Sequence, residues 1–132
     1  MPERNSYEYA IVRIVPRVER QEFVNAGVIV YSRVLKFLEA KVLLDRDRLL
    51  TLFPSIDLDE VERHLLMIPK IAAGDTTGGP IAALPQHERF HWLVAPRSTI
   101  IQTSPCHSGL TTTPAEVLEG LFERLVGSIG NR

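Results

Sequence analysis

The sequence has one cysteine and no excess of charge of either sign. Cys106 on its own excludes an internal disulfide framework, so the composition gives no sign of an oxidising compartment. The 15 Lys and Arg residues are balanced by 16 Asp and Glu residues, for a formal net charge of -1. Proteins whose whole surface serves the phosphate backbone of nucleic acid carry a clear basic excess, which this chain lacks. A local basic patch is still compatible with these counts.

Long apolar runs are also missing. The first residues, MPERNSYEY, have no apolar core of a signal peptide, and no run approaches the roughly 20 apolar residues of a membrane span. We therefore expect a cytoplasmic protein without a membrane segment. With 132 residues, 45% of them hydrophobic, the chain is long enough for one domain, 1–132, and too short for two.

Four segments have the composition of β-strands: Tyr7 to Val15, Val28 to Tyr31, Val34 to Leu44 and Thr99 to Thr103. The first carries apolar side chains on both parities, which predicts a strand covered on both faces, and Pro16 ends it by removing a backbone donor. The second and third are so close in the chain that they predict a hairpin. In the third, Glu39 and Lys41 alternate with apolar residues, so we expect one face in solvent and a place near the sheet edge.

Helical spacing and end signals predict helices over Asp45 to Phe53, Asp57 to Ile68, Pro85 to Val94 and Thr113 to Gly127. Asp57 and Glu60 have the spacing of a capping box. Thr113 and Pro114 have the residue types of a helix N-cap and first position. The sum is an α+β fold in which about four mainly antiparallel strands pack with three or four helices on one or both faces.

The loop after the first strand is rich in arginine and predicts an anion pocket. We expect Arg13, Arg17 and Arg20 to converge at the end of the strand, because guanidinium groups suit phosphate or carboxylate. The same candidate site draws on residues from elsewhere in the chain: Asn25, Arg97, Ser98, His107, and Thr111, Thr112 and Thr113 before the last helix, whose free N–H groups attract anions. The alternative is that Arg17 and Arg20 pair with Glu19 and Glu22 on a solvated loop, that Thr113 only caps its helix, and that Asn25 belongs to a turn with Gly27.

Two other patterns suggest enzymatic chemistry. His87, Glu88 and His91 match the H-E-x-x-H pattern of zinc hydrolases, with His107 as the nearest candidate for a third ligand and Glu88 as general base. The bland alternative is an exposed turn of a helix whose other side is buried. Cys106 next to His107 suggests an activated thiol, but adjacent residues of an extended chain point apart, which disfavours a catalytic pair.

Two blocks of the chain, YEYAIVRIVPRVERQEFVNAGVIVY and RFHWLVAPRSTIIQTSPCHSGLTTTPAEVLEGLFERLV, resemble the uncharacterised bacterial family catalogued as domain of unknown function 3037. The resemblance covers nearly the whole chain and centres in the second block on Arg89-Phe90 and Trp92-Leu93, without demanding His91. It implies a compact bacterial protein and lends no reaction or cofactor. Members look to be encoded at times beside HipA-like kinase domains, which implies such a kinase as a partner.

These observations favour a noncatalytic accessory module that binds a partner protein or a phosphate-bearing ligand, with no cofactor. One alternative is a metal-dependent hydrolase built on His87 and His91. Another is a weak nucleic-acid binder that would stack bases on Tyr7, Tyr9 or Trp92. We also expect a homodimer if the third strand has an uncovered edge.

Overall fold

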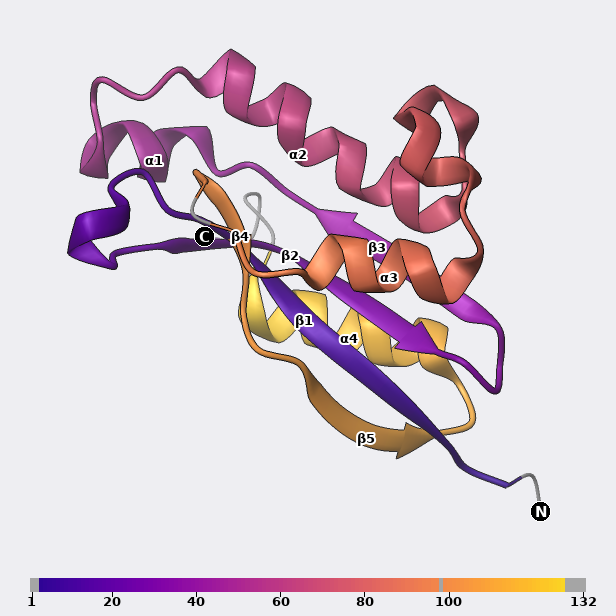
Figure 1. The fold of residues 1–132 in the computed structure, drawn as a ribbon. Coiled ribbons are helices and arrows are strands. Elements are labelled where there is room, and N and C mark those ends of the chain that lie inside the picture. Colours follow the sequence, from indigo (N-terminus) through magenta and orange to yellow (C-terminus); the bar gives the residue numbers. More distant parts are fainter. Residues whose placement is uncertain (1–2, 98, 128–132) are drawn as a thin grey trace.

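The computed structural model describes residues 3–97 and 99–127, and Figure 1 shows a β-sheet with helices on both of its faces. The strands are β1 (Asn5–Ile14), β2 (Val24–Ser32), β3 (Phe37–Val42), β4 (Ile101–Thr103) and β5 (His107–Thr111). The α-helices are α1 (Arg46–Leu52), α2 (Leu58–Ala73), α3 (Gln86–Val94) and α4 (Pro114–Leu125), and three short 3-10 helices cover Val18–Arg20, Thr76–Gly78 and Pro80–Ala83. The expected α+β fold is confirmed. In the described ranges, no helix is long and apolar enough to cross a membrane.

The sheet is antiparallel and has β1 at its centre. β2 pairs with one side of β1 and β3 with the far side of β2, while β4 and β5 share the other side of β1. Helices α2 and α3 cover one face, where Val12, Ile14 and Ile29 pack with Leu65 and Phe90. Helix α4 covers the other face with a smaller cluster of Val28, Val30, Leu118 and Leu121. The predicted strand covered on both faces is therefore the central strand of the sheet.

A β-bulge in β2 decides which side chains reach each face. Val12 pairs with Gly27 but Arg13 pairs with Asn25, so one residue of β2 is extra. Asn25 therefore lies inside a strand, where its Nδ2 donates to the Leu125 carbonyl oxygen at 3.1 Å. The interpretation of Asn25 as part of a turn is wrong, because the bulge lets the ladder continue through this polar stretch.

The outer strand beside β1 is interrupted at Ser104. This residue is buried, its N–H donates to the Ile11 carbonyl at 2.9 Å, and its hydroxyl oxygen accepts from the Ile11 N–H at 2.9 Å. The side chain thus replaces a backbone acceptor where the chain breaks between β4 and β5. Strand β5 was not predicted from the sequence. It packs closely against β1, since a Cβ on Gly109 would lie 2.5 Å from the Tyr7 hydroxyl oxygen.

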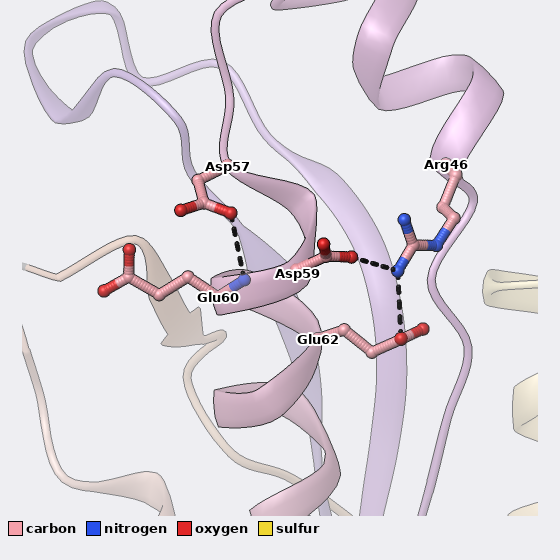
Figure 2. A network of polar contacts seen from close by, with 5 residues as sticks. All are labelled: Arg46, Asp57, Asp59, Glu60 and Glu62. Atoms are coloured by element: carbon pink, nitrogen blue, oxygen red, sulfur yellow. Dashed lines mark hydrogen bonds and ion pairs between the residues drawn. The ribbon is translucent and has the colours of Figure 1, made fainter.

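Helix α2 is held at its start by a polar network, which Figure 2 shows. The Asp57 carboxylate accepts from the Glu60 backbone N–H at 3.2 Å, which confirms the predicted cap. Arg46 at the start of α1 donates to Glu62 at 3.0 Å and to Asp59 at 3.1 Å. These two hydrogen bonds, that to Glu62 first, raise the pKa of Arg46 above its ordinary value. The network fixes the first turns of α2, which form a wall of the site described below.

Strand β3 lies at the edge of the sheet, as expected. Its Lys41, however, does not simply face water: its ammonium contacts the Glu119 carboxylate at 2.7 Å and lies 4.8 Å from the centre of the Phe122 ring. The expected solvent face is present in part: Glu39 is exposed and the Lys41 side chain is 43% exposed, while α4 extends across β2 and reaches β3 at Lys41. Homodimerisation through the β3 edge stays a prediction.

Candidate functional site

Three adjoining pockets have volumes of about 400, 370 and 340 Å³; the second and third lie along α2, and the first lies before it, between residues 52–57 and the loop after β1. The first and second share Asp57 and Ile100, and the second and third share His64, Thr99 and Ile101. They therefore form one groove, which we call the α2 groove. One wall is a helical stripe of α2 and the other is the chain that leads into β4. From Asp57 to the last lining residue of α2, Ile71, the helix rises about 21 Å.

The far end of the α2 groove is apolar and closes on an aromatic–cation pair. Met67, Ile81 and Ile101 are among its lining residues. The Arg97 guanidinium lies 4.3 Å from the centre of the Trp92 ring, and Trp92 is 40% exposed. Arg97 also donates to the carbonyls of Trp92 and Leu93, where α3 ends, and burial lowers its pKa. The Arg97 charge is thus held at the C-terminal, negative end of α3. The aliphatic part of Arg97 and the Trp92 ring form the edge of the groove at this end.

The near end of the α2 groove contains Arg17 and Arg20. The Arg20 Nε lies 2.5 Å from a carboxylate oxygen of Glu22, so this arginine is paired on an exposed loop. The side chain of Arg17 has no hydrogen bond or ion pair with the rest of the described chain. Arg17 therefore brings a positive charge without an ion pair to this end, where the carboxylates of Glu22 and Asp57 line the same pocket.

The structure does not bring Arg13 together with Arg17 and Arg20. Arg13 pairs with Asn25 and Gln102 in the sheet and lines a different pocket with Phe23. The reason is the alternation of β1: Val12 and Ile14 point to the α2 face, which sends Arg13 to the α4 face. The expected convergence of the three arginines fails on this geometry, although anion binding by each of them stays a prediction.

The threonines before α4 lie at the opposite end of β1. Thr111 pairs with Asn5, about 26 Å along the strand from Arg13. Its hydroxyl oxygen accepts from the Thr113 N–H at 3.0 Å, and the Thr113 hydroxyl donates to Glu116 at 3.2 Å. Thr112 is exposed. These hydrogen bonds hold the backbone at the start of α4. The three threonines lie at the other end of β1 from Arg13.

Three further residues of the expected site have other surroundings. His107 is exposed on β5 and its ring lies 5.1 Å from that of Tyr9, centre to centre. Asn25 is tied to the last turn of α4 through Leu125. Ser98 lies outside the described residues.

The H-E-x-x-H segment is exposed on α3. The rings of His87 and His91 lie 6.3 Å apart, centre to centre, on one side of the helix. His107 cannot join them: its neighbour Tyr9 packs on the α4 side of the sheet, whereas Phe90 of α3 packs on the other. In the part of the chain that the structure describes, no three His, Cys, Asp or Glu side chains gather as metal ligands would. The hydrolase alternative therefore has no third ligand in this geometry.

Cys106 is an exposed thiol without activation. Partial desolvation of its sulfur raises the pKa above the ordinary value, and the negative charge of Glu8 adds to this effect. An activated cysteine needs the opposite shift. His107 lies beside it in the chain but contacts Tyr9.

The α2 groove itself was missed in the sequence. The sequence predicts a helix over Asp57 to Ile68 but gives no sign that one side of it lines a groove. The pair Trp92 and Arg97 could have indicated the groove from sequence. An arginine just after the end of a helix can fold back over an aromatic ring five residues earlier, and tryptophan and arginine are both common at binding surfaces.

The comparisons with known proteins give one finding. A family model described as "Protein of unknown function (DUF3037)" matches residues 9–126. No curated protein and no solved structure matches the chain.

Proposed function

The chain belongs to the DUF3037 family, whose description assigns no function, and we propose from its geometry that it is a noncatalytic module which binds an extended segment of a partner protein in the α2 groove. The observation that carries the proposal is the continuity of the three pockets. The part of the groove along α2, about 21 Å, matches roughly six residues of extended chain at about 3.3 Å each, and the first pocket extends it beyond Asp57. Small-molecule sites are more often single enclosed cavities.

The lining of the groove suggests what the bound segment carries. The middle and far end would take apolar side chains, beside the exposed Trp92 and its Arg97 partner. Tryptophan and arginine are enriched among the residues that dominate protein interfaces. Arg17, which makes no ion pair within the described chain, favours a singly charged acidic residue at the near end.

Recognition would rest on side chains more than on strand addition. Strand β4 is short, and the Thr99 hydroxyl already donates to the Ile101 carbonyl at 2.8 Å. An incoming strand would have to displace this hydrogen bond. The pockets, in contrast, are open to side chains without any rearrangement of the backbone.

A phosphate-bearing ligand suits the α2 groove less well. Carboxylates of Glu22 and Asp57 line the same pocket as Arg17, so a doubly charged phosphate would meet repulsion as well as attraction. No specific contact favours nucleic acid either: Tyr7 and Tyr9 pack against the cluster under α4, and Arg97 already lies over the partly exposed ring of Trp92. The resemblance described above supplies a HipA-like kinase as a partner to test.

The proposal can be tested with a displayed library of random peptides, selected on the purified protein. We expect enriched peptides to share apolar residues and an acidic residue near one end. Thr99→Trp should abolish their binding, because Thr99 lines both the second and third pockets. The matched control is Thr112→Trp, which adds the same ring at an exposed position before α4.

A second pair of variants tests the charge. Arg17→Glu should weaken the selected peptides about tenfold or more, since attraction becomes repulsion. Arg33→Glu makes the same change at an exposed position in the turn between β2 and β3 and should leave binding unchanged. Selected peptides, or a HipA-like kinase, that bind equally well to Thr99→Trp and Arg17→Glu would overturn the proposal, as would a library that yields no binder at all.

A further inference from the structure

A separate pocket of about 360 Å³ surrounds Arg13. It is lined by Arg13, Val15, Gln21, Phe23, Gln102 and Thr103, none of which lines the α2 groove. Its volume lies at the lower end of the range for small-molecule sites. Whatever binds here would not compete directly with a peptide in the α2 groove.

Arg13 has donor capacity that the protein does not use. Its Nε is buried and has no hydrogen-bond partner, and its guanidinium makes no ion pair within the described chain. Buried donors in folded proteins are nearly always paired, because an unpaired one loses its hydration without replacement. The two Nη groups also have no hydrogen-bond partner within the described chain and are not buried, so they are the donors that an acceptor from outside can reach.

The surroundings of Arg13 favour an anion with an apolar part. No carboxylate lines the pocket, in contrast to the near end of the α2 groove. The Arg13 guanidinium lies 4.1 Å from the centre of the Phe23 ring, and Phe23 is 45% exposed. This cation–π contact restrains the guanidinium beside the ring before a ligand arrives. The rest of the Phe23 ring stays open as an apolar surface.

The polar neighbours add to this picture. Gln21 has a left-handed backbone conformation, with φ of 55°, and an exposed side chain at the pocket. The Gln102 amide donates to the Thr99 carbonyl at 2.9 Å, which holds it in place. Both side chains are neutral, so neither opposes a negative charge. A purely structural role for Arg13 is the competing explanation, since its strand partner Asn25 holds the negative end of α4.

We propose that the Arg13 pocket binds a small molecule through a carboxylate or phosphate group, with the apolar part of that molecule resting on Phe23. The oxyanion would accept two N–H groups of the Arg13 fork in a bidentate arrangement. This site is independent of the α2 groove and its peptide.

The test follows the Arg13 Nε–H resonance of labelled protein by NMR while sodium phosphate, acetate or benzoate is added at constant ionic strength. We expect a saturable shift of that resonance, and the comparison of phosphate with acetate identifies the group that the fork prefers. Benzoate should bind several-fold more tightly than acetate, because its ring can rest on Phe23. Phe23→Leu should remove this advantage and leave acetate binding unchanged.

Variants of Arg13 complete the design. Arg13→Gln should abolish the response of neighbouring amides to all three anions, and Arg13→Lys should weaken it because an ammonium lacks the fork. Arg33→Gln, an equal change of charge at an exposed turn, should leave it unchanged. If Arg13→Gln does not fold, Arg13→Lys and Phe23→Leu carry the test.

Two results would overturn the proposal. One is a wild-type Arg13 resonance that does not shift with any of the three anions up to high millimolar concentration. The other is an anion response that is the same in Arg13→Gln, Arg13→Lys and wild type, which would leave Arg13 with a structural role only. Peptide binding in the α2 groove should be unaffected in every Arg13 variant, so failure of one proposal is distinguishable from failure of the other.

Discussion

Replacing Gly27 with alanine is expected to destabilise the protein, whereas the same replacement at Gly120 is expected to stabilise it. An added Cβ at Gly27 would lie 2.7 Å from the Lys41 carbonyl oxygen and 2.7 Å from a methyl group of Val42. Carbon atoms do not approach backbone atoms this closely, so β2 and β3 would have to move apart. At Gly120, in the middle of α4, nothing lies within 4 Å of the added carbon.

The two effects differ in sign and have known sizes. Overpacking of a close contact costs about 1–3 kcal/mol. Glycine inside a helix is less stable than alanine by about 0.5–1 kcal/mol, so Gly120→Ala should gain that amount. For a chain of 132 residues, 1 kcal/mol corresponds to about 4 °C in melting temperature.

Urea unfolding followed by circular dichroism measures both changes. The midpoint should fall for Gly27→Ala and rise for Gly120→Ala with similar slopes, because the change is in stability and not in the surface exposed on unfolding. A Gly27→Ala protein as stable as wild type would refute the close approach of β2 and β3 at the bulge. A loss of stability in Gly120→Ala would refute the open space beside α4.

Three further predictions concern single side chains. Asn25→Ala should lower the free energy of unfolding by about 1 kcal/mol, measured in urea, because it removes the hydrogen bond to the last turn of α4; no change would mean that the bond is not formed in solution. Hydrogen bonds from the Thr77 backbone and hydroxyl lower the pKa of Asp75, so its contribution is present above the ordinary value of 3.8 and is lost as pH falls through the lower folded value. The stability difference between wild type and Asp75→Ala, measured by thermal melting, should therefore shrink under acid conditions, and a difference that grows there would contradict this sign. Alkylation of Cys106 by iodoacetamide should have a midpoint above the ordinary thiol pKa of 9.0 and move down in Glu8→Gln; a midpoint below 9.0 would contradict the desolvation of the thiol.

Helices were the part of the fold most open to prediction. The cap at Asp57 and the proline at the start of α4 are local signals, and the apolar spacing that follows each of them is regular. Helices are stabilised by residues three and four positions apart, so a short stretch of sequence contains most of the information.

Strand β5 could not be predicted in the same way. Its sequence, HSGLT, has little β-propensity and no alternation of apolar residues. It forms because β1 offers it an edge and because Gly109 leaves room for the Tyr7 ring. The residues that make β5 a strand are those of β1, about a hundred positions earlier in the chain, so no local pattern around β5 predicts it.

The structure brings some of the predicted site residues together, and their binding role stays a prediction. The loop arginines do line a groove, and Arg97 lines the same groove at its other end. Arg13 separates from them because one position along a strand changes the face of the sheet. The groove itself depends on how α2 and the chain before β4 are placed against each other, which no local pattern encodes.

The interruption at Ser104 has a consequence for self-association. Fibrillar stacking of identical chains draws on uninterrupted extended segments of about six or seven residues. The margin next to β1 offers pieces of only three and five residues, with Pro105 between them. A strand of a neighbouring molecule that paired with β4 or β5 would lose its register at Pro105. This edge of the sheet therefore resists fibril growth, although the short strand β4 stays free to line the groove.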